Sequence, residues 1–198
     1  MFKTKVLTRY SITALTEDEF YSENGIDPDN LSYAGEGDFG EAFHTGDDRI
    51  LKKTSSYSEY RIALETQKKK MDGFAEIYAT EKINGTYYIL QEELEHDSSI
   101  EETMVRLNSM LETQGLSVQY MSHFDDDEYL EQEGDEVIDG RIDPELAHFM
   151  TELEDIVRGY RMLGIEASDI RAENMGRDKQ GKLKAFDIDD KDPRSHWK

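Results

Sequence analysis

Three oxygen-bearing side chains near the end of the chain are spaced in a way that suits phosphate chemistry. Asp169 precedes Asn174 by five residues, and Asp187 follows Asn174 by thirteen, at the end of a short alternating segment that predicts a strand. Phosphoryl transfer needs a carboxylate beside the attacking hydroxyl, and oxygen ligands for Mg²⁺. Asp169 can orient the hydroxyl and accept its proton, and Asn174 and Asp187 offer the hard oxygens that Mg²⁺ prefers. The simpler alternative is an acidic loop that caps a hairpin. The choice between this loop and a phosphoryl-transfer site depends on the elements that precede the stretch in the sequence.

The first of these elements is a glycine-rich stretch. Gly35, Gly37 and Gly40 form the pattern G-x-G-x-x-G, and residues 41–52 after it predict a strand, a turn and a strand. A dinucleotide-binding turn would instead open a helix. We therefore expect a hairpin that covers phosphates, whose backbone N–H groups can approach closely because no Cβ stands in the way.

A lysine follows this hairpin in the predicted strand 50–53. Lys52 is the candidate for the phosphate-facing cation. Its neighbour Lys53 is expected on the opposite face, because side chains alternate along a strand. A lysine pair at a strand end is otherwise most often a solvated edge, so the role of Lys52 depends on its neighbours.

Residues 55–71 predict a helix capped by Ser56 or Ser58. Glu59 and Glu65 can each hold Lys52, but only one of them can do so, because a separation of six residues places them on different helix faces. We favour Glu59 for its early position. The apolar face of this helix is expected to include Tyr60, Ala63, Leu64 and Gln67.

Two strands, 74–81 and 86–91, are predicted around Asn84-Gly85, a strong hairpin signal between apolar runs. Helices are predicted over 98–113 and 143–163, the second beginning with Asp143 as cap and Pro144 at its first position. The acidic segment 122–142 predicts a solvated loop, with docking of a basic partner as the alternative.

These elements occur together in the order found in protein kinases, and residues 31–190 resemble a minimal member of the protein-kinase-like fold, similar to small bacterial, effector or phage Ser/Thr kinases. The resemblance implies an α+β, two-lobed protein-kinase-like fold with a truncated C-terminal lobe. Its N-lobe would span 31–94 and a mostly helical C-lobe 95–198, with residues 1–30 as an extension that packs on the first lobe.

The resemblance also implies ATP and Mg²⁺ as cofactors and assigns a role to each candidate residue. Asp169, Lys52 and Glu59 would be catalytic. The nucleotide would be bound by Gly35, Gly37, Gly40 and Lys52, with Gln91 as gatekeeper and Glu92 to Leu94 meeting the adenine edge. Asn174 and Asp187 would hold the metal.

Some kinase features are replaced in this chain. Ala167-Ser168 stands in place of His-Arg, and Asp187-Ile188-Asp189 in place of D-F-G. The chain stops eleven residues after Asp187, so we expect no activation segment and no regulation by its phosphorylation. The usual platform for a peptide substrate would also be missing, which leaves the substrate more open than the nucleotide.

The composition limits the partners. The 198 residues carry a net charge of −22, which disfavours nucleic acid and anionic membranes and favours a basic protein partner or substrate. There is no Cys, no signal-peptide-like start and no apolar run of membrane-spanning length, so we expect a cytoplasmic protein, or one in the host-cell cytoplasm if a virus or pathogen delivers it.

Three functions remain after this reading. The first is an ATP- and Mg²⁺-dependent kinase acting on protein Ser/Thr, favoured by Asp169, Asn174 and Asp187. The second is a pseudokinase or acidic binding protein that inhibits a basic partner, favoured by the net charge and the short second lobe. The third is a small-molecule phosphotransferase of the antibiotic-kinase type.

Overall fold

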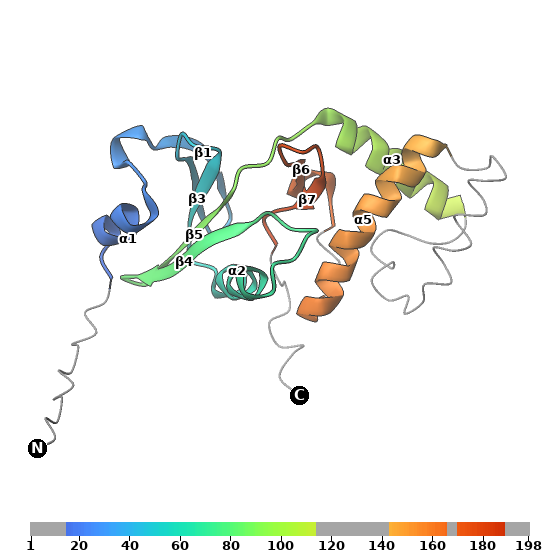
Figure 1. Cartoon of the computed structure of the whole chain (residues 1–198). Coiled ribbons are helices and arrows are strands. Elements are labelled where there is room, and N and C mark those ends of the chain that lie inside the picture. The colour runs from blue at the N-terminus through green and yellow to red at the C-terminus, as the bar shows by residue number, and fades with distance from the viewer. Residues whose placement is uncertain (1–14, 114–142, 166–169, 189–198) are drawn as a thin grey trace, which may run out of the picture.

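A computed structural model describes residues 15–113, 143–165 and 170–188. Within these ranges the chain has an α+β architecture with a five-stranded antiparallel sheet and four α-helices, which confirms the α+β class. The acidic segment 122–142 lies outside the described residues. Figure 1 shows the sheet between α1 at one end and α3 and α5 at the other.

The large sheet has the strand order β1-β2-β3-β5-β4. Its strands are β1 (Ser32–Gly37), β2 (Gly40–His44), β3 (Arg49–Thr54), β4 (Ile77–Ile83) and β5 (Thr86–Glu92). Every pairing is antiparallel. Three of the pairs, β1–β2, β2–β3 and β4–β5, are hairpins. The fourth pair, β3 and β5, is separated in the chain by a helix and by β4.

The β4–β5 hairpin turns at the predicted Asn84-Gly85 pair. Both residues have positive φ, 50° and 93°, which is the backbone conformation that Asn and Gly tolerate best. This turn fixes the register in which Ile83 faces Thr86. The hairpin signal in the sequence is thus confirmed, although β4 begins three residues later than predicted.

Helix α1 (Glu17–Asn24) covers one face of the sheet. It begins with the capping box of Thr16 and Glu19 and ends at Gly25, which has φ 64°. Its side chains Phe20 and Tyr21 pack in a buried cluster with residues of the sheet and of the following loop: Ile26, Leu51, Ile83, Tyr88 and Leu90. The short 3₁₀ helix Pro28–Asn30 then leads into β1.

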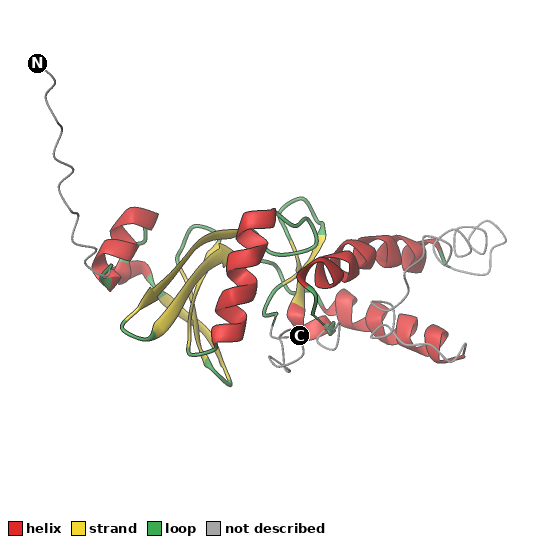
Figure 2. Ribbon diagram, turned by 90° about the horizontal axis from the view of Figure 1, so that it is seen from below, coloured by secondary structure: helices red, strands yellow, loops and turns green. Residues whose placement is uncertain are grey.

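Helix α2 (Tyr57–Lys69) covers the opposite face of the sheet, where Figure 2 shows it lying across the strands. Ser56 is its cap, one of the two candidates from the sequence. The expected buried face was wrong by about one position. The buried residues are Glu59, Ile62, Ala63 and Thr66, because the helix turns Glu59 toward Lys52, and Tyr60 instead stacks on Tyr87 with ring centroids 4.7 Å apart.

The remaining elements form a second packed region. They are α3 (Ser98–Thr113), α5 (Pro144–Leu163), the 3₁₀ helix η4 (Ala172–Asn174), β6 (Met175–Arg177) and β7 (Leu183–Ala185). The Asp143 side chain caps α5 by accepting the N–H of Glu145, as its sequence predicts. The apolar face of α5 is buried together with α3 and the β6–β7 hairpin, and includes Phe149, Leu153, Ile156 and Tyr160.

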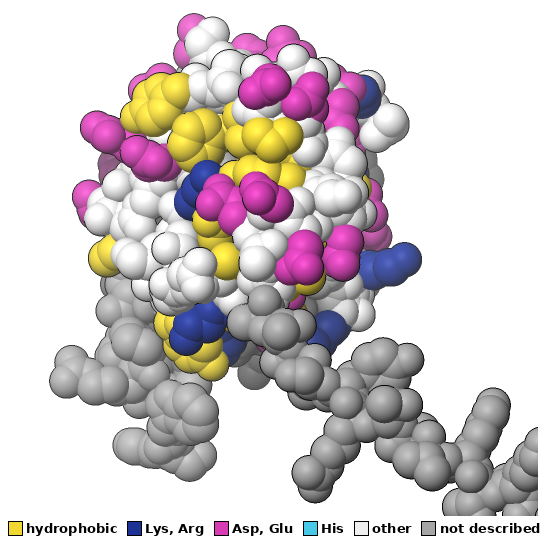
Figure 3. Space-filling view, turned by 90° about the vertical axis from the view of Figure 1, so that its left-hand side faces the viewer, with side chains coloured by type: hydrophobic (Ala, Val, Ile, Leu, Met, Phe, Trp, Pro, Cys, Tyr) yellow, Lys and Arg dark blue, Asp and Glu magenta, His cyan; other side chains and the backbone are white. Residues whose placement is uncertain are grey.

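Two further observations concern the helices and the surface. None of the helices in the described ranges is long and apolar enough to cross a membrane. The end of the molecule that carries α1 shows Asp and Glu side chains interleaved with hydrophobic ones and only a few Lys or Arg (Figure 3).

Candidate functional site

A pocket of about 480 Å³ lies between the large sheet and the β6–β7 hairpin. Its volume falls within the range of roughly 300–1,000 Å³ typical of small-molecule sites. It is lined by every candidate site residue in the described ranges: Gly35, Gly37, Gly40, Lys52, Glu59, Gln91, Glu92, Leu94, Asn174 and Asp187. Asp169 lies outside the described residues, so the structure does not place it.

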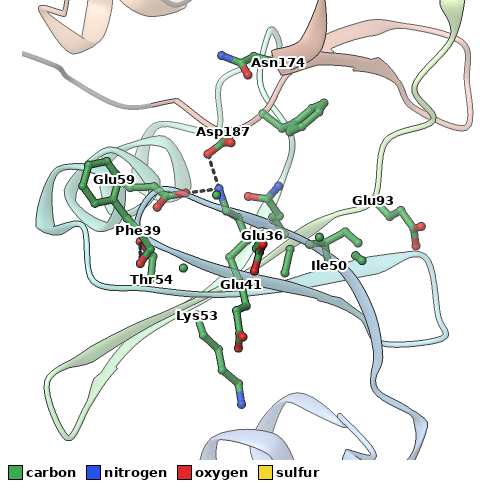
Figure 4. A pocket seen from close by; sticks show the side chains of 18 of the residues that line it. Glu36, Phe39, Glu41, Ile50, Lys53, Thr54, Glu59, Glu93, Asn174 and Asp187 are labelled. Atoms are coloured by element: carbon green, nitrogen blue, oxygen red, sulfur yellow. Dashed lines mark hydrogen bonds and ion pairs between the residues drawn. The ribbon is translucent and has the colours of Figure 1, made fainter.

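Strand register places Lys52 on the pocket face of β3. It is paired with Ala42 on one side and with Ile89 on the other. Lys53 points to the opposite face, as its neighbouring position requires, and its Nζ atom lies 2.6 Å from the Glu17 carboxylate of α1. Figure 4 shows Lys53 directed away from the side on which Glu59 and Asp187 lie.

The ammonium of Lys52 contacts two carboxylates. Its Nζ atom donates to Glu59 of α2 and to Oδ1 of Asp187, the latter at 2.5 Å. Of the two glutamates that the sequence left open, Glu59 is therefore the one against Lys52, whereas Glu65 pairs with Lys68 on the exposed side of α2.

The protonation of this cluster follows from its burial and its charges. Burial alone would lower the pKa of Lys52, but the adjacent Glu59 and Asp187 outweigh it and raise that pKa, so the ammonium persists at neutral pH. Burial raises the pKa of Asp187, but the contact with Lys52 prevails and the net shift is downward. For Glu59 burial dominates over Lys52 and raises the pKa.

Asp187 and Asn174 are brought together by the β6–β7 hairpin. Asn174 ends η4 immediately before β6, and its backbone carbonyl accepts the N–H of Phe186 at 2.8 Å. Asp187 follows two residues after β7 with φ 56°, an uncommon conformation for a non-glycine residue, which turns its carboxylate toward Lys52. Figure 4 shows Asn174 above Asp187 on the same side of the pocket.

This pair suits a magnesium ion that arrives with phosphates. In the described part of the chain, no three His, Cys, Asp or Glu side chains gather into a group that could hold a metal alone. One carboxylate and one amide nevertheless fit Mg²⁺, which commonly takes one or two protein oxygens and completes its shell with water and substrate phosphates. The Mg²⁺ site at Asn174 and Asp187 stays a prediction.

The three glycines of the hairpin have different surroundings. A Cβ on Gly40 would lie 2.0 Å from the carbonyl oxygen of Lys53, so the fold itself requires glycine there. A Cβ on Gly35 or Gly37 would meet nothing within 4 Å, and neither residue has a positive φ. The protein fold does not explain the last two glycines, but close approach of a pocket ligand to the backbone would explain them.

The segment 91–94 closes the other end of the pocket. Gln91 is buried between β3 and β4, and the N–H of Glu92 donates to the carbonyl of Glu76 at 2.8 Å. The Glu92 carboxylate pairs with Lys184 of β7 at 2.8 Å. A Cβ on Gly176 would lie 2.7 Å from Cβ of Leu94, so β6 packs directly against this segment.

Sequence reasoning missed several residues of the pocket. His44, on the pocket face of β2, has its Nδ1 atom 2.7 Å from the Glu93 carboxylate, and Ile50, Arg171 and Phe186 also line the pocket. The alternation along β2 and β3 could have identified His44 and Ile50, since they lie two positions from Ala42 and Lys52. Nothing in the local sequence pairs His44 with Glu93, 49 positions later.

Comparison with known proteins adds no identification. No protein-family model matches the chain, and no curated protein matches it. The candidate function therefore depends on the geometry of the pocket.

Proposed function

We propose that this protein is a minimal kinase of the protein-kinase-like fold, which binds Mg·ATP in the pocket and transfers the γ-phosphoryl group to a protein Ser/Thr hydroxyl. The observation that carries the proposal is the position of Lys52, whose ammonium contacts Glu59 and Asp187 beneath the glycine-rich hairpin. A charged lysine between two carboxylates has the position and charge needed to hold a phosphate group.

Each side chain then has a defined task. Lys52 binds phosphate oxygens, and Glu59 orients Lys52 from α2. Gly35 and Gly37 let backbone N–H groups approach the phosphates, and Asn174 and Asp187 supply oxygen ligands. When bound, Mg²⁺ would neutralise phosphate charge and orient the nucleotide.

The residue that would act on the acceptor hydroxyl is inferred from the sequence. Asp169 is five residues before Asn174, which lines the pocket, so we expect its carboxylate near the transferred group. Asp169 would orient the acceptor hydroxyl and take its proton, a role worth about 10²–10⁴-fold in rate.

The test is phosphate transfer from γ-labelled ATP, with Mg²⁺, to protein acceptors of basic and acidic composition. Wild type is expected to label an acceptor, and Asp169→Ala to lower turnover by about 10²–10⁴-fold while leaving ATP affinity nearly unchanged. Asp169→Asn should be nearly as damaging, because it keeps the shape and removes the charge. Transfer by the Asp169 variants at the wild-type rate would refute the assignment.

A pseudokinase is the second candidate, and the charge of the pocket favours it. Its lining includes more carboxylates than cationic side chains, among them Glu36, Asp38, Glu41, Glu92 and Glu93. Such a lining repels a free triphosphate and depends on Lys52 and Mg²⁺ to offset the repulsion. The protein would be a pseudokinase if it binds a basic partner but transfers phosphate to no acceptor. The acceptors tested should include small-molecule alcohols and amines.

A further inference from the structure

The sheet surface opposite the pocket carries the exposed Tyr33 and the half-buried Phe43 at its β1–β2 end. Tyr33 and Phe43 are paired in the register of these strands, and their rings meet edge to face with centroids 6.2 Å apart. Tyr33 is 57% exposed, whereas α1 covers Leu51 and Tyr88 farther along the same face. Solvent-exposed aromatic side chains beside a buried core are a feature of binding surfaces.

Two glutamates lie next to this aromatic pair. Glu36 and Glu41 are directly opposed in the β1–β2 register, and both are exposed. In the described part of the chain neither forms an ion pair, and like charges at directly opposed positions destabilise a sheet. Partial burial together with these two carboxylates raises the pKa of Tyr33, which shows that all three side chains are close. We call Tyr33, Glu36, Glu41 and Phe43 the outer β1–β2 face.

A lysine of the chain itself shows what this surface accepts. The Nζ atom of Lys53 lies 5.3 Å from the ring centroid of Phe43, and 5.6 and 5.5 Å from those of Tyr21 and Tyr88. Its charge is met by Glu17, at 2.6 Å. An ammonium over aromatic rings beside a carboxylate is a favourable arrangement. Phe43 and Glu41 of the outer β1–β2 face adjoin this lysine, since Glu41 and Lys53 are directly opposed in the β2–β3 register, and Tyr33 and Glu36 extend the same chemistry to β1.

We propose that the outer β1–β2 face binds a lysine- or arginine-bearing segment of a partner protein. One cationic side chain would lie against Tyr33 and Phe43, and the segment would relieve the repulsion between Glu36 and Glu41. The net charge of −22 would attract such a partner, and Figure 3 shows the acidic and hydrophobic side chains intermixed at this end of the molecule. By strand alternation Glu41 and Phe43 lie on the face of β2 opposite Ala42 and His44, so a segment bound there does not require the nucleotide, although Glu36 and Glu41 also border the pocket.

The test is the affinity of a fluorescent peptide of alternating Lys and Ala for the full chain at low salt, compared with a peptide in which Gln replaces Lys. The Lys peptide should bind, and Glu36→Gln/Glu41→Gln should weaken it by roughly tenfold, with a similar loss for Tyr33→Ser. The double variant should also unfold at a higher temperature than wild type, because it removes a like-charge pair. Backbone amide shifts caused by the peptide should map to β1 and β2.

The matched control is Glu101→Gln/Glu102→Gln, which removes the same charge from exposed positions on α3. It should bind the Lys peptide as wild type does. Equal weakening by both double variants, or amide shifts spread away from β1 and β2, would mean attraction by net charge alone and would overturn the proposal. The Lys peptide could also bind only after Lys3, Lys5 and Arg9 are replaced by Gln. That result would mean that the N-terminal segment, and not a partner protein, binds the outer β1–β2 face.

Discussion

The Nζ atom of Lys52 lies 2.5 Å from Oδ1 of Asp187, although 135 positions separate the two residues. The same nitrogen contacts Glu59, so a single ammonium joins β3, α2 and the segment after β7. All three residues line the candidate pocket.

Lys52→Met should weaken the binding of Mg·ATP, whereas Lys53→Met should leave it unchanged. Hydrogen bonds to charged groups contribute about 1.5–3 kcal/mol, so loss of Lys52 should weaken binding by roughly tenfold to a hundredfold. Lys53 makes its contacts with α1 instead, so its replacement should lower the melting temperature without changing the ligand-induced shift. Thermal unfolding with and without Mg·ATP measures both effects. Equal losses of the shift in the two variants would contradict the assignment.

Glu59→Gln should lower the rate of transfer, and Glu65→Gln should not. Glu59 is buried against Lys52, whereas Glu65 lies on the exposed side of α2 and pairs with Lys68. The amide keeps the shape of the carboxylate but no longer fixes the ammonium by charge, so kcat/KM should fall about tenfold. Steady-state kinetics of both variants test this, and a wild-type rate for Glu59→Gln would exclude the positioning role.

The three hairpin glycines should separate binding from folding. Gly40→Ala should destabilise the protein by roughly 2–3 kcal/mol, because its Cβ would lie 2.0 Å from a backbone oxygen and the strands would have to shift. Gly35→Ala and Gly37→Ala should leave the free energy of unfolding nearly unchanged and weaken Mg·ATP binding. Denaturant unfolding and nucleotide titration distinguish these effects. Unaltered nucleotide affinity in Gly37→Ala would argue against phosphates beneath the hairpin.

Part of this arrangement was accessible from sequence because it is local. The caps of α1, α2 and α5, the Asn84-Gly85 turn and the opposite directions of Lys52 and Lys53 follow from residue types within a few positions of one another. Local patterns depend on backbone sterics and strand alternation, which operate in the same way in most proteins.

Other features depend on tertiary contacts that no local pattern contains. The buried face of α2 was predicted one position away from the observed one. The ion pair between Lys52 and Glu59 buries Glu59, and the spacing of apolar residues in the sequence does not predict this contact. The contact of His44 with Glu93 and the packing of Leu94 on Gly176 likewise join distant segments. The φ of 56° at Asp187 has no signal in the residues beside it.

Alkaline pH should destabilise the protein through the contact of α1 with the sheet. Burial lowers the pKa of Lys53, but Glu17 and Tyr21 prevail and raise it to about 12, so its contribution is present below pH 10.5 and is lost as the pH rises toward 12. Burial and Glu17 raise the pKa of Tyr21 to about 12 as well, so the unfolded chain loses this proton first and stability falls over the same range. Melting temperatures between pH 9 and 12 should show a decline that is smaller in Lys53→Met. A flat profile for wild type would contradict this prediction.

Calorimetric titration of the wild type and of Asp187→Ala with ATP, in the presence of Mg²⁺ and in the presence of EDTA, tests the central claim most directly. The proposal expects wild type to bind one ATP per chain more tightly with Mg²⁺ than with EDTA, and Asp187→Ala to lose that gain because it lacks the metal-binding carboxylate. The opposite result would be Mg²⁺-independent binding in wild type, an unchanged gain in Asp187→Ala, or no binding of ATP under any of these conditions. The first and third results would show that the pocket beneath the glycine-rich hairpin is not a Mg·ATP site, and the second would show that Asp187 does not hold the metal.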